Sequence, residues 1–225
     1  MAVEDTLYTF RQHFMQSIQI LPICVGILSF FVFAGTFNVA HLFLSLGLLI
    51  LLPIGIVLLN SIAAKVFPLI FSDDLWRLAE GAQCFFGKCA TDTFVTYWLP
   101  ATAFIITYVF MNAYDLYNLP ARAPKDKKLA GEYGAKVAAR KAHSAFAMAA
   151  TTLIGVLLVV WRIYSMADTP LGVVFGLSLG VGSSVALYKF MVGCGLGLRN
   201  SDIFGISSRI VATNRDGVAC YPVAT

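Results

Sequence analysis

Five apolar blocks without a formal charge limit what this chain can fold into. They cover residues 20–37, 39–59, 93–113, 144–161 and 170–188, and none contains Asp, Glu, Lys or Arg. Each is close to the about 20 residues with which an α-helix crosses about 30 Å of hydrocarbon. The chain is also only 12% charged, whereas a soluble domain is about 25% charged. We therefore predict an all-α integral membrane protein with about five transmembrane helices.

Only Asn38 separates the first two blocks. Residues 20–59 are therefore predicted to form a tight helical hairpin, in which Pro22 and Pro53 would bend the helices. Aromatic residues stand near both ends of the third block, as they do at the two interfaces of a membrane helix. The fourth and fifth blocks make up residues 144–188, with a short connection between them.

The Lys and Arg residues predict how the chain is oriented. Five spans place eleven of the 16 on the side of the third loop and the carboxyl-terminal tail, and five on the other side. Lys and Arg accumulate in cytoplasmic loops. We therefore predict that the third loop and the tail are cytoplasmic and that the amino terminus lies across the membrane.

Two segments outside the spans have predicted helices. In residues 1–19, Leu7, Phe10 and Phe14 fall on one helical face, which favours a helix lying in the membrane interface. A frayed terminus is the alternative. In residues 60–92, Ser72 can cap a short amphipathic helix of this loop.

The carboxyl-terminal tail, residues 189–225, has a different pattern. Two short apolar stretches flank Asp216-Gly217, a dipeptide typical of a β-hairpin turn. A lone hairpin is marginally stable in water. We expect either a hairpin, which pairs with the sheet edge of a neighbouring protein or lies on the basic helix predicted in the third loop, or a disordered, irregular tail.

The third loop, residues 114–143, is strongly basic. Glu132, Lys136 and Arg140 recur every four residues, which predicts a helix that continues into the fourth span and protrudes from the membrane. Its basic residues are Arg122, Lys125, Lys127, Lys128, Lys136, Arg140 and Lys141. They suit anionic lipid headgroups or an acidic partner. The plainer interpretation is the usual excess of positive charge in cytoplasmic loops.

Residues for chemistry are scarce in the spans. Membrane enzymes and pumps hold ionisable groups inside the bilayer, but His41, Lys65 and His143 all fall near predicted span ends. We expect no enzyme activity, no catalytic residues, no cofactor, no metal and no direct binding of nucleic acid. Cys84 and Cys89 lie in one loop without a His, so free thiols are favoured and a disulfide is the alternative.

A packing pattern marks the fifth span. Gly172, Gly176, Gly180 and Ser184 recur every four residues and leave a groove that another helix can approach closely. Two partners are open. One is an internal helix, for which the face of Ala145, Ala149 and Thr152 on the fourth span is a candidate, and the other is a second subunit.

Several short motifs carry a resemblance. They are Tyr114-Asp115-Leu116-Tyr117-Asn118-Leu119-Pro120, Arg140-Lys141, Asp202-Ile203-Phe204-Gly205-Ile206 and Cys220-Tyr221-Pro222. With them, the second half of the chain resembles small multispan membrane proteins of large icosahedral DNA viruses, in particular those of algal chloroviruses. The resemblance implies a protein of the membrane beneath the capsid, whose third loop and tail contact minor capsid proteins on the cytoplasmic, capsid-facing side. It supplies no catalytic residues.

These patterns favour a structural membrane protein that anchors or scaffolds a protein layer on a bilayer. Two other functions remain open. One is a small accessory subunit of an energy-converting membrane complex. The other is a pore or carrier, whose path Ser45, Thr102, Thr107 and Ser178 would have to line.

Overall fold

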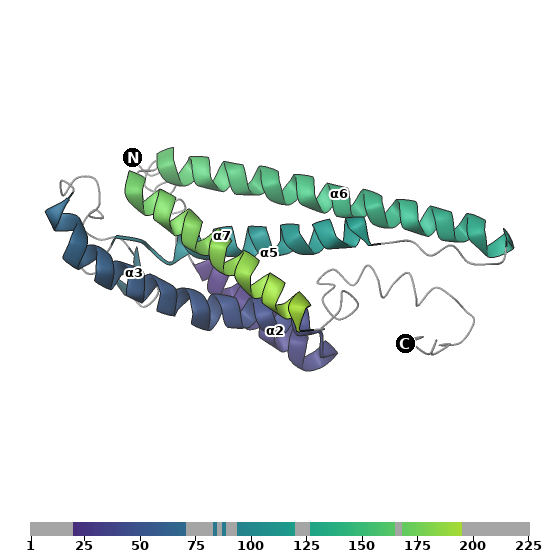
Figure 1. The fold of residues 1–225 in the computed structure, drawn as a ribbon, viewed down its shortest axis with the longest axis horizontal. Coiled ribbons are helices and arrows are strands. Elements are labelled where there is room, and N and C mark those ends of the chain that lie inside the picture. The colour runs from purple at the N-terminus through teal and green to yellow at the C-terminus, as the bar shows by residue number, and fades with distance from the viewer. Residues whose placement is uncertain are drawn as a thin grey trace, which may run out of the picture.

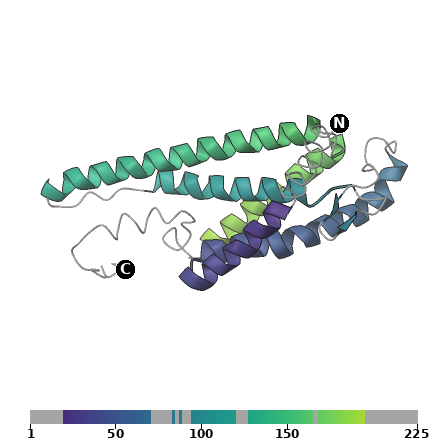
Figure 2. The same ribbon diagram turned by 180° about the vertical axis from the view of Figure 1, so that it is seen from behind.

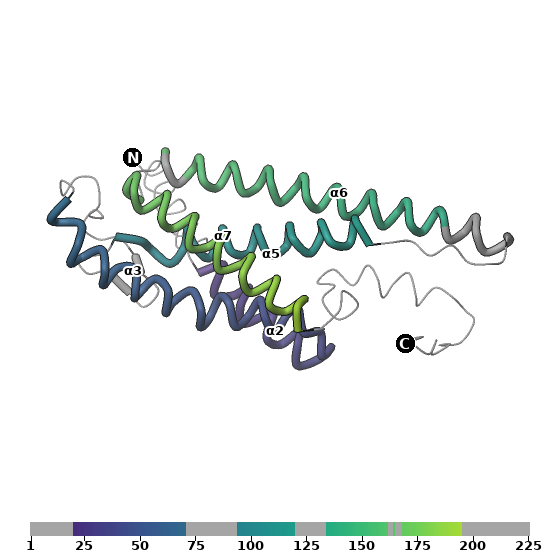
Figure 3. The backbone as a smooth tube through the Cα atoms, viewed as in Figure 1, coloured from purple at the N-terminus to yellow at the C-terminus, as the bar shows by residue number. Residues whose placement is uncertain are grey.

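The computed structural model describes residues 20–70, 83–84, 87–88, 94–119, 127–164 and 168–194. Figure 3 traces the backbone through them. Three predicted features lie outside these residues: the interfacial helix of residues 1–19, the short helix after Ser72 and the hairpin in the tail. For 83–84, 87–88, 127–133 and 162–163, only the backbone is described.

Within the described part, the chain forms five helices. The first covers Ile20–Thr36. The second runs from Val39 to Leu69 as α2 (Val39–Leu46), the π-helical turn η1 (Gly47–Leu51), α3 (Leu52–Val66) and the 3₁₀ turn η2 (Phe67–Leu69). The others are α5 (Trp98–Asn118), α6 (Lys127–Tyr164) and α7 (Pro170–Gly193). In the loop between α3 and α5, the two-residue strands β1 (Gln83–Cys84) and β2 (Gly87–Lys88) pair antiparallel, which the sequence had not predicted.

Three helices are long and apolar enough to cross a membrane: Val39–Leu69, Gly134–Trp161 and Pro170–Gly193. The apolar helix Ile20–Thr36 is shorter. This confirms the prediction of an all-helical protein with apolar helices long enough to cross a membrane. It confirms the count of five spans only in part, because α5, which corresponds to the predicted third span, is not among the long apolar helices.

The position of α5 explains its composition. It packs against both α6 and α7, and η1 also touches it. Figures 1 and 2 show it between α6 on one side and the second helix and α7 on the other. Ten of its 21 residues are buried. A helix enclosed in this way can keep polar side chains because neighbouring helices, rather than lipid, surround them.

The outer helices carry large apolar side chains on the outside of the bundle. Large apolar side chains such as Phe31, Val57, Phe146 and Leu153 are more than 60% exposed. Such surfaces are unfavourable in water and suit contact with lipid. The interior holds aliphatic side chains such as Leu48 and Leu52 together with small, aromatic and hydrogen-bonded polar ones, and the small and polar residues are those expected where helices associate within a bilayer.

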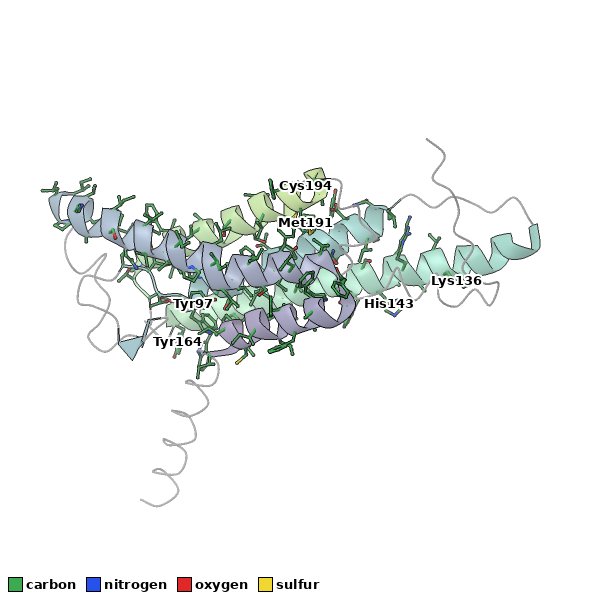
Figure 4. The ribbon with its side chains drawn as sticks, turned by 90° about the horizontal axis from the view of Figure 1, so that it is seen from below. Tyr97, Lys136, His143, Tyr164, Met191 and Cys194 are labelled. Carbon is green, nitrogen blue, oxygen red and sulfur yellow. The ribbon has the colours of Figure 1, made fainter. Side chains whose placement is uncertain are left out.

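Contacts between helices set their directions. Tyr97 meets Leu48 while Tyr108 meets Ala40, so the second helix runs antiparallel to α5. Arg140 of α6 meets Leu119 just past the end of α5, and α7 runs parallel to α5, as shown below. The start of α2, the ends of α5 and α7, and residue 140 of α6 therefore lie at one end of the bundle, which we call the rod end. Figure 4 shows Met191, Cys194 and His143 toward this end and Tyr97 and Tyr164 toward the other.

The turn before α2 is tight. Phe37 has a φ of 53°, a left-handed conformation that is uncommon for a residue with a side chain. Asn38 then caps α2, because its side-chain oxygen accepts the N–H of Ala40 at 3.0 Å. The hairpin predicted around Asn38 therefore forms by local capping.

Candidate functional site

The small residues of α7 are packed against α5. A Cβ atom on Gly172 would lie 2.7 Å from the carbonyl oxygen of Phe94, and one on Gly180 would overlap the carbonyl oxygen of Pro100. Gly176 faces Leu99 at ordinary contact distance. Phe94 lies just before α5, so the three contacts advance in the same direction along α7 and along the chain through α5, which makes the two helices parallel. Close approach of two helix backbones is the effect expected from small residues at a membrane helix interface.

The partner of this groove is α5, and not the candidate face on the fourth span. Ala145, Ala149 and Thr152 of α6 are all exposed. Ser184, the last member of the pattern, is fully buried, and its hydroxyl finds no hydrogen-bond partner among the described residues. The glycines of α7 thus serve contact inside the chain.

A π-helical turn receives a hydrogen bond from Tyr97. In η1, the N–H of Leu52 donates to Gly47, five residues earlier, instead of to Leu48. The next possible backbone donor to Leu48, five residues later, is Pro53, which has no N–H. The Tyr97 hydroxyl donates to the Leu48 carbonyl at 2.8 Å. A side chain of α5 thus supplies the donor that the backbone of the second helix lacks.

Asn60 of α3 clamps the chain just before α5. Its side-chain oxygen accepts the N–H groups of Phe94 at 3.0 Å and Val95 at 2.9 Å. Its side-chain nitrogen donates to the Val95 carbonyl at 3.1 Å. One amide therefore satisfies three backbone groups of a non-helical segment, which would otherwise be costly to bury.

At the rod end, polar side chains join α5 to α7 and α2. The hydroxyl of Tyr188 on α7 donates to the carboxylate of Asp115 at 2.8 Å. The hydroxyl of Tyr108 is 3.1 Å from the Ala40 carbonyl and 3.3 Å from the sulfur of Met191. The two tyrosine rings meet edge to face, with centroids 5.4 Å apart. Each of these groups is engaged by a neighbouring helix, so the cluster holds helices together.

The basic residues of the third loop fall into different environments. Lys127 and Lys128 begin α6, while Arg122 and Lys125 lie outside the described residues. Lys136 is half-buried and Lys141 is exposed. Arg140, predicted as part of a surface ladder, is instead buried and donates to the Leu119 carbonyl. It does so because the positive charge suits the negative end of the α5 helix dipole.

The thiols give little evidence of a site. Cys84 stands in β1, but Cys89 lies outside the described residues, so the choice between free thiols and a disulfide stays open. Cys24 and Cys194 are free and exposed. Across the described ranges, no group of three His, Cys, Asp or Glu side chains is placed to hold a metal ion.

The four polar residues named for a pore do not share one environment. Ser45 is buried, Thr102 and Thr107 are half-buried, and Ser178 is exposed. The Ser178 hydroxyl donates to Val174 of its own helix at 2.8 Å.

Comparison with known proteins finds no matching family model, no matching curated protein and no matching solved structure. The resemblance to viral membrane proteins therefore rests on the sequence motifs alone.

Sequence reasoning missed the polar contacts between helices. The predicted second span ended at residue 59, one residue before Asn60, and the predicted third span ended at residue 113, before Asp115. The sequence did hold a signal for both residues, because Asn60 and Asp115 each lie within one helical turn of the end of the preceding apolar block. What the sequence lacked was the partner, since each contact joins residues at least 34 positions apart.

Proposed function

We propose that this protein is a structural membrane protein that anchors a protein layer on a bilayer, in the membrane beneath the capsid of a large icosahedral DNA virus. The observation that carries the proposal is the length of α6. This helix has 38 residues and begins at Lys127, whereas α5 ends opposite Arg140. The 13 residues from 127 to 139 therefore extend about 20 Å beyond α5 at about 1.5 Å per residue.

The base of this rod is fixed. Arg140 donates to the end of α5, and the Lys141 ammonium lies 5.6 Å from the centre of the Tyr117 ring. Two contacts at the point where α6 leaves the bundle hold its direction relative to α5. Figure 1 shows α6 extending past the end of α5. A rod with a fixed direction and a basic tip is suited to holding an acidic protein surface at a set distance from the membrane.

The bundle interior supports the same function. Three of its polar side chains join separate parts of the chain: Tyr97 and Tyr188 join helices, and Asn60 joins α3 to the segment before α5. Such bonds stabilise one arrangement of helices. A bundle of this kind suits an anchor, whereas a carrier needs helices that change partners.

The test is the protein composition of purified virions. We expect the chain in amounts stoichiometric with the proteins of the layer above the membrane, retained in high salt and released by detergent. Amine-reactive cross-linking of intact particles should join Lys127 and Lys128 to that layer. Lys65, exposed near the end of α3 and at the opposite end of the bundle, is the matched control and should not react with it.

Three results would contradict the proposal. The chain could be found only in host membranes, the cross-links from Lys65 could equal those from Lys127, or liposomes containing the purified chain could conduct ions or small solutes. The last result would favour the pore.

A further inference from the structure

Lys141 stands at the depth of the lipid headgroups. It is the last formal charge before residues 142–161, which contain no Asp, Glu, Lys or Arg. These residues are helical, and at about 1.5 Å per residue they span about 30 Å, the thickness of the hydrocarbon core. The Lys141 ammonium therefore lies at the membrane surface on the rod side.

Tyr117 lies against this position, and a second tyrosine stands near it along α5. Tyr114 and Tyr117 are three residues apart on α5 and so share a helix face. They are 50% and 37% exposed. The Lys141 Nζ lies 5.6 Å from the centre of the Tyr117 ring, within the range of a cation–π contact. We call Lys141, Tyr114 and Tyr117 the tyrosine–lysine seat.

The charge of Lys141 is not neutralised by the described side chains. The Tyr117 ring is its one interaction among them. Arg140 beside it differs, because it is buried and engaged at the carboxyl end of α5. Since Arg140 offsets the negative end of the α5 dipole, the ammonium of Lys141 remains available to an anion from outside the chain.

We propose that the tyrosine–lysine seat binds the phosphate group of an anionic phospholipid in the rod-side leaflet. The ammonium of Lys141 supplies the charge and hydrogen-bond donors that a phosphate oxygen needs, and the exposed phenols of Tyr117 and Tyr114 on the adjoining face of α5 offer further donors. The depth of the seat favours lipid over a protein partner. Lys136 lies five residues further out along α6, about 7 Å away, and residues beyond it are the ones within reach of a protein layer. The inference requires only that α6 crosses a membrane, so it stands apart from the proposed function.

The experiment measures lipid binding to the full chain in a neutral detergent. Native mass spectrometry counts the molecules retained as short-chain phosphatidylglycerol, short-chain phosphatidylcholine or inorganic phosphate is added. We expect phosphatidylglycerol to bind at least fivefold more tightly than phosphatidylcholine. Inorganic phosphate at the same concentration should not displace it, because the lipid also contacts the apolar helix surface.

Variants of the seat locate the site. Lys141→Gln should weaken phosphatidylglycerol binding about fivefold, as expected for one basic residue at a membrane surface. Lys141→Arg should retain binding. Tyr117→Leu should weaken it about two- to fivefold because the ring that positions the ammonium is lost.

The matched control is Lys189→Gln, which removes an exposed lysine near the end of α7, on the same side of the membrane but outside the seat. It should change binding less than twofold. An equal loss in Lys189→Gln and Lys141→Gln refutes the seat, as does equal affinity for the two lipids or displacement by inorganic phosphate. If Lys141→Gln does not fold, the comparison of lipids on the unaltered chain and the Tyr117→Leu variant decide.

Discussion

The hydrogen bond from Tyr97 to Leu48 makes a quantitative test of the π-helical turn possible. Tyr97 is 4% exposed and Leu48 is fully buried. Tyr97→Phe removes only the hydroxyl, so the Leu48 carbonyl loses its donor while the packing of the ring is kept. No backbone donor can replace it, because the N–H of Leu52 is bonded to Gly47 and Pro53 has none.

The expected cost follows from the burial of this carbonyl. A buried acceptor left unsatisfied costs about 1–3 kcal/mol in proteins generally, and hydrogen bonds between membrane helices are worth up to about 1.7 kcal/mol. We expect Tyr97→Phe to lower the free energy of unfolding by about 1.5 kcal/mol. In a Pro53→Ala background, Leu48 regains a backbone donor whether the turn stays π-helical or becomes α-helical. The cost of Tyr97→Phe should then fall to about 0.5 kcal/mol, within the range of coupling measured for interacting pairs.

The assay is unfolding of the purified chain in mixed micelles with increasing SDS, followed by tryptophan fluorescence. The matched control is Tyr114→Phe, since the Tyr114 ring is half exposed and should tolerate the change within about 0.5 kcal/mol. The reasoning is refuted if Tyr97→Phe costs no more than this control. It is also refuted if the cost is the same with Pro53 and with Ala at that position.

Further substitutions test the other helix contacts by the same assay. Gly180→Ala should destabilise the bundle by about 1–3 kcal/mol, because the added methyl group overlaps the Pro100 carbonyl. Gly182→Ala, on the same helix with open space around it, should be neutral or stabilise by up to about 1 kcal/mol, and an equal loss in both would contradict the packing. Asn60→Ala should cost about 2–4 kcal/mol, because three backbone groups lose their partner. Ser61→Ala should cost less than about 0.5 kcal/mol, because that hydroxyl is exposed and bonded within its own helix; similar losses at 60 and 61 would contradict the clamp.

The sequence predicted the apolar helices well and their contacts poorly. Length and absence of charge are local properties, so the three long apolar helices could be found from composition alone. The glycines of α7 also predicted close packing against an internal helix or a second subunit. The structure places an internal helix there, but it is α5 and not the Ala-rich face of α6. Which helix packs against these glycines depends on the direction and tilt of α7, and local sequence patterns do not determine either.

Arg140 and Asp115 show the same limit for charged residues. A spacing of four residues placed Arg140 on a helix correctly, but it could not tell the exposed side from the side facing α5. Asp115 was expected in a loop because the apolar block had ended, yet α5 continues through it to Asn118. A helix can extend past its apolar block when another helix supplies a partner for the first charged residue that follows. For Asp115, that partner is Tyr188 of α7.

The central helix α5, which is not among the long apolar helices, lies inside the bundle for a physical reason. Lipid surrounds apolar side chains as well as a neighbouring helix does, so burial of apolar surface gives membrane helices little reason to associate. Polar side chains do favour association, because lipid offers them no hydrogen-bond partner whereas a neighbouring helix can. The hydroxyls and amides that meet at α5, from Tyr97 at one end to Tyr188 at the other, therefore determine which helices are neighbours. Two other contacts, from Arg140 to Leu119 and from Lys141 to Tyr117, hold α6 against α5 and set the direction in which the basic rod leaves the bundle.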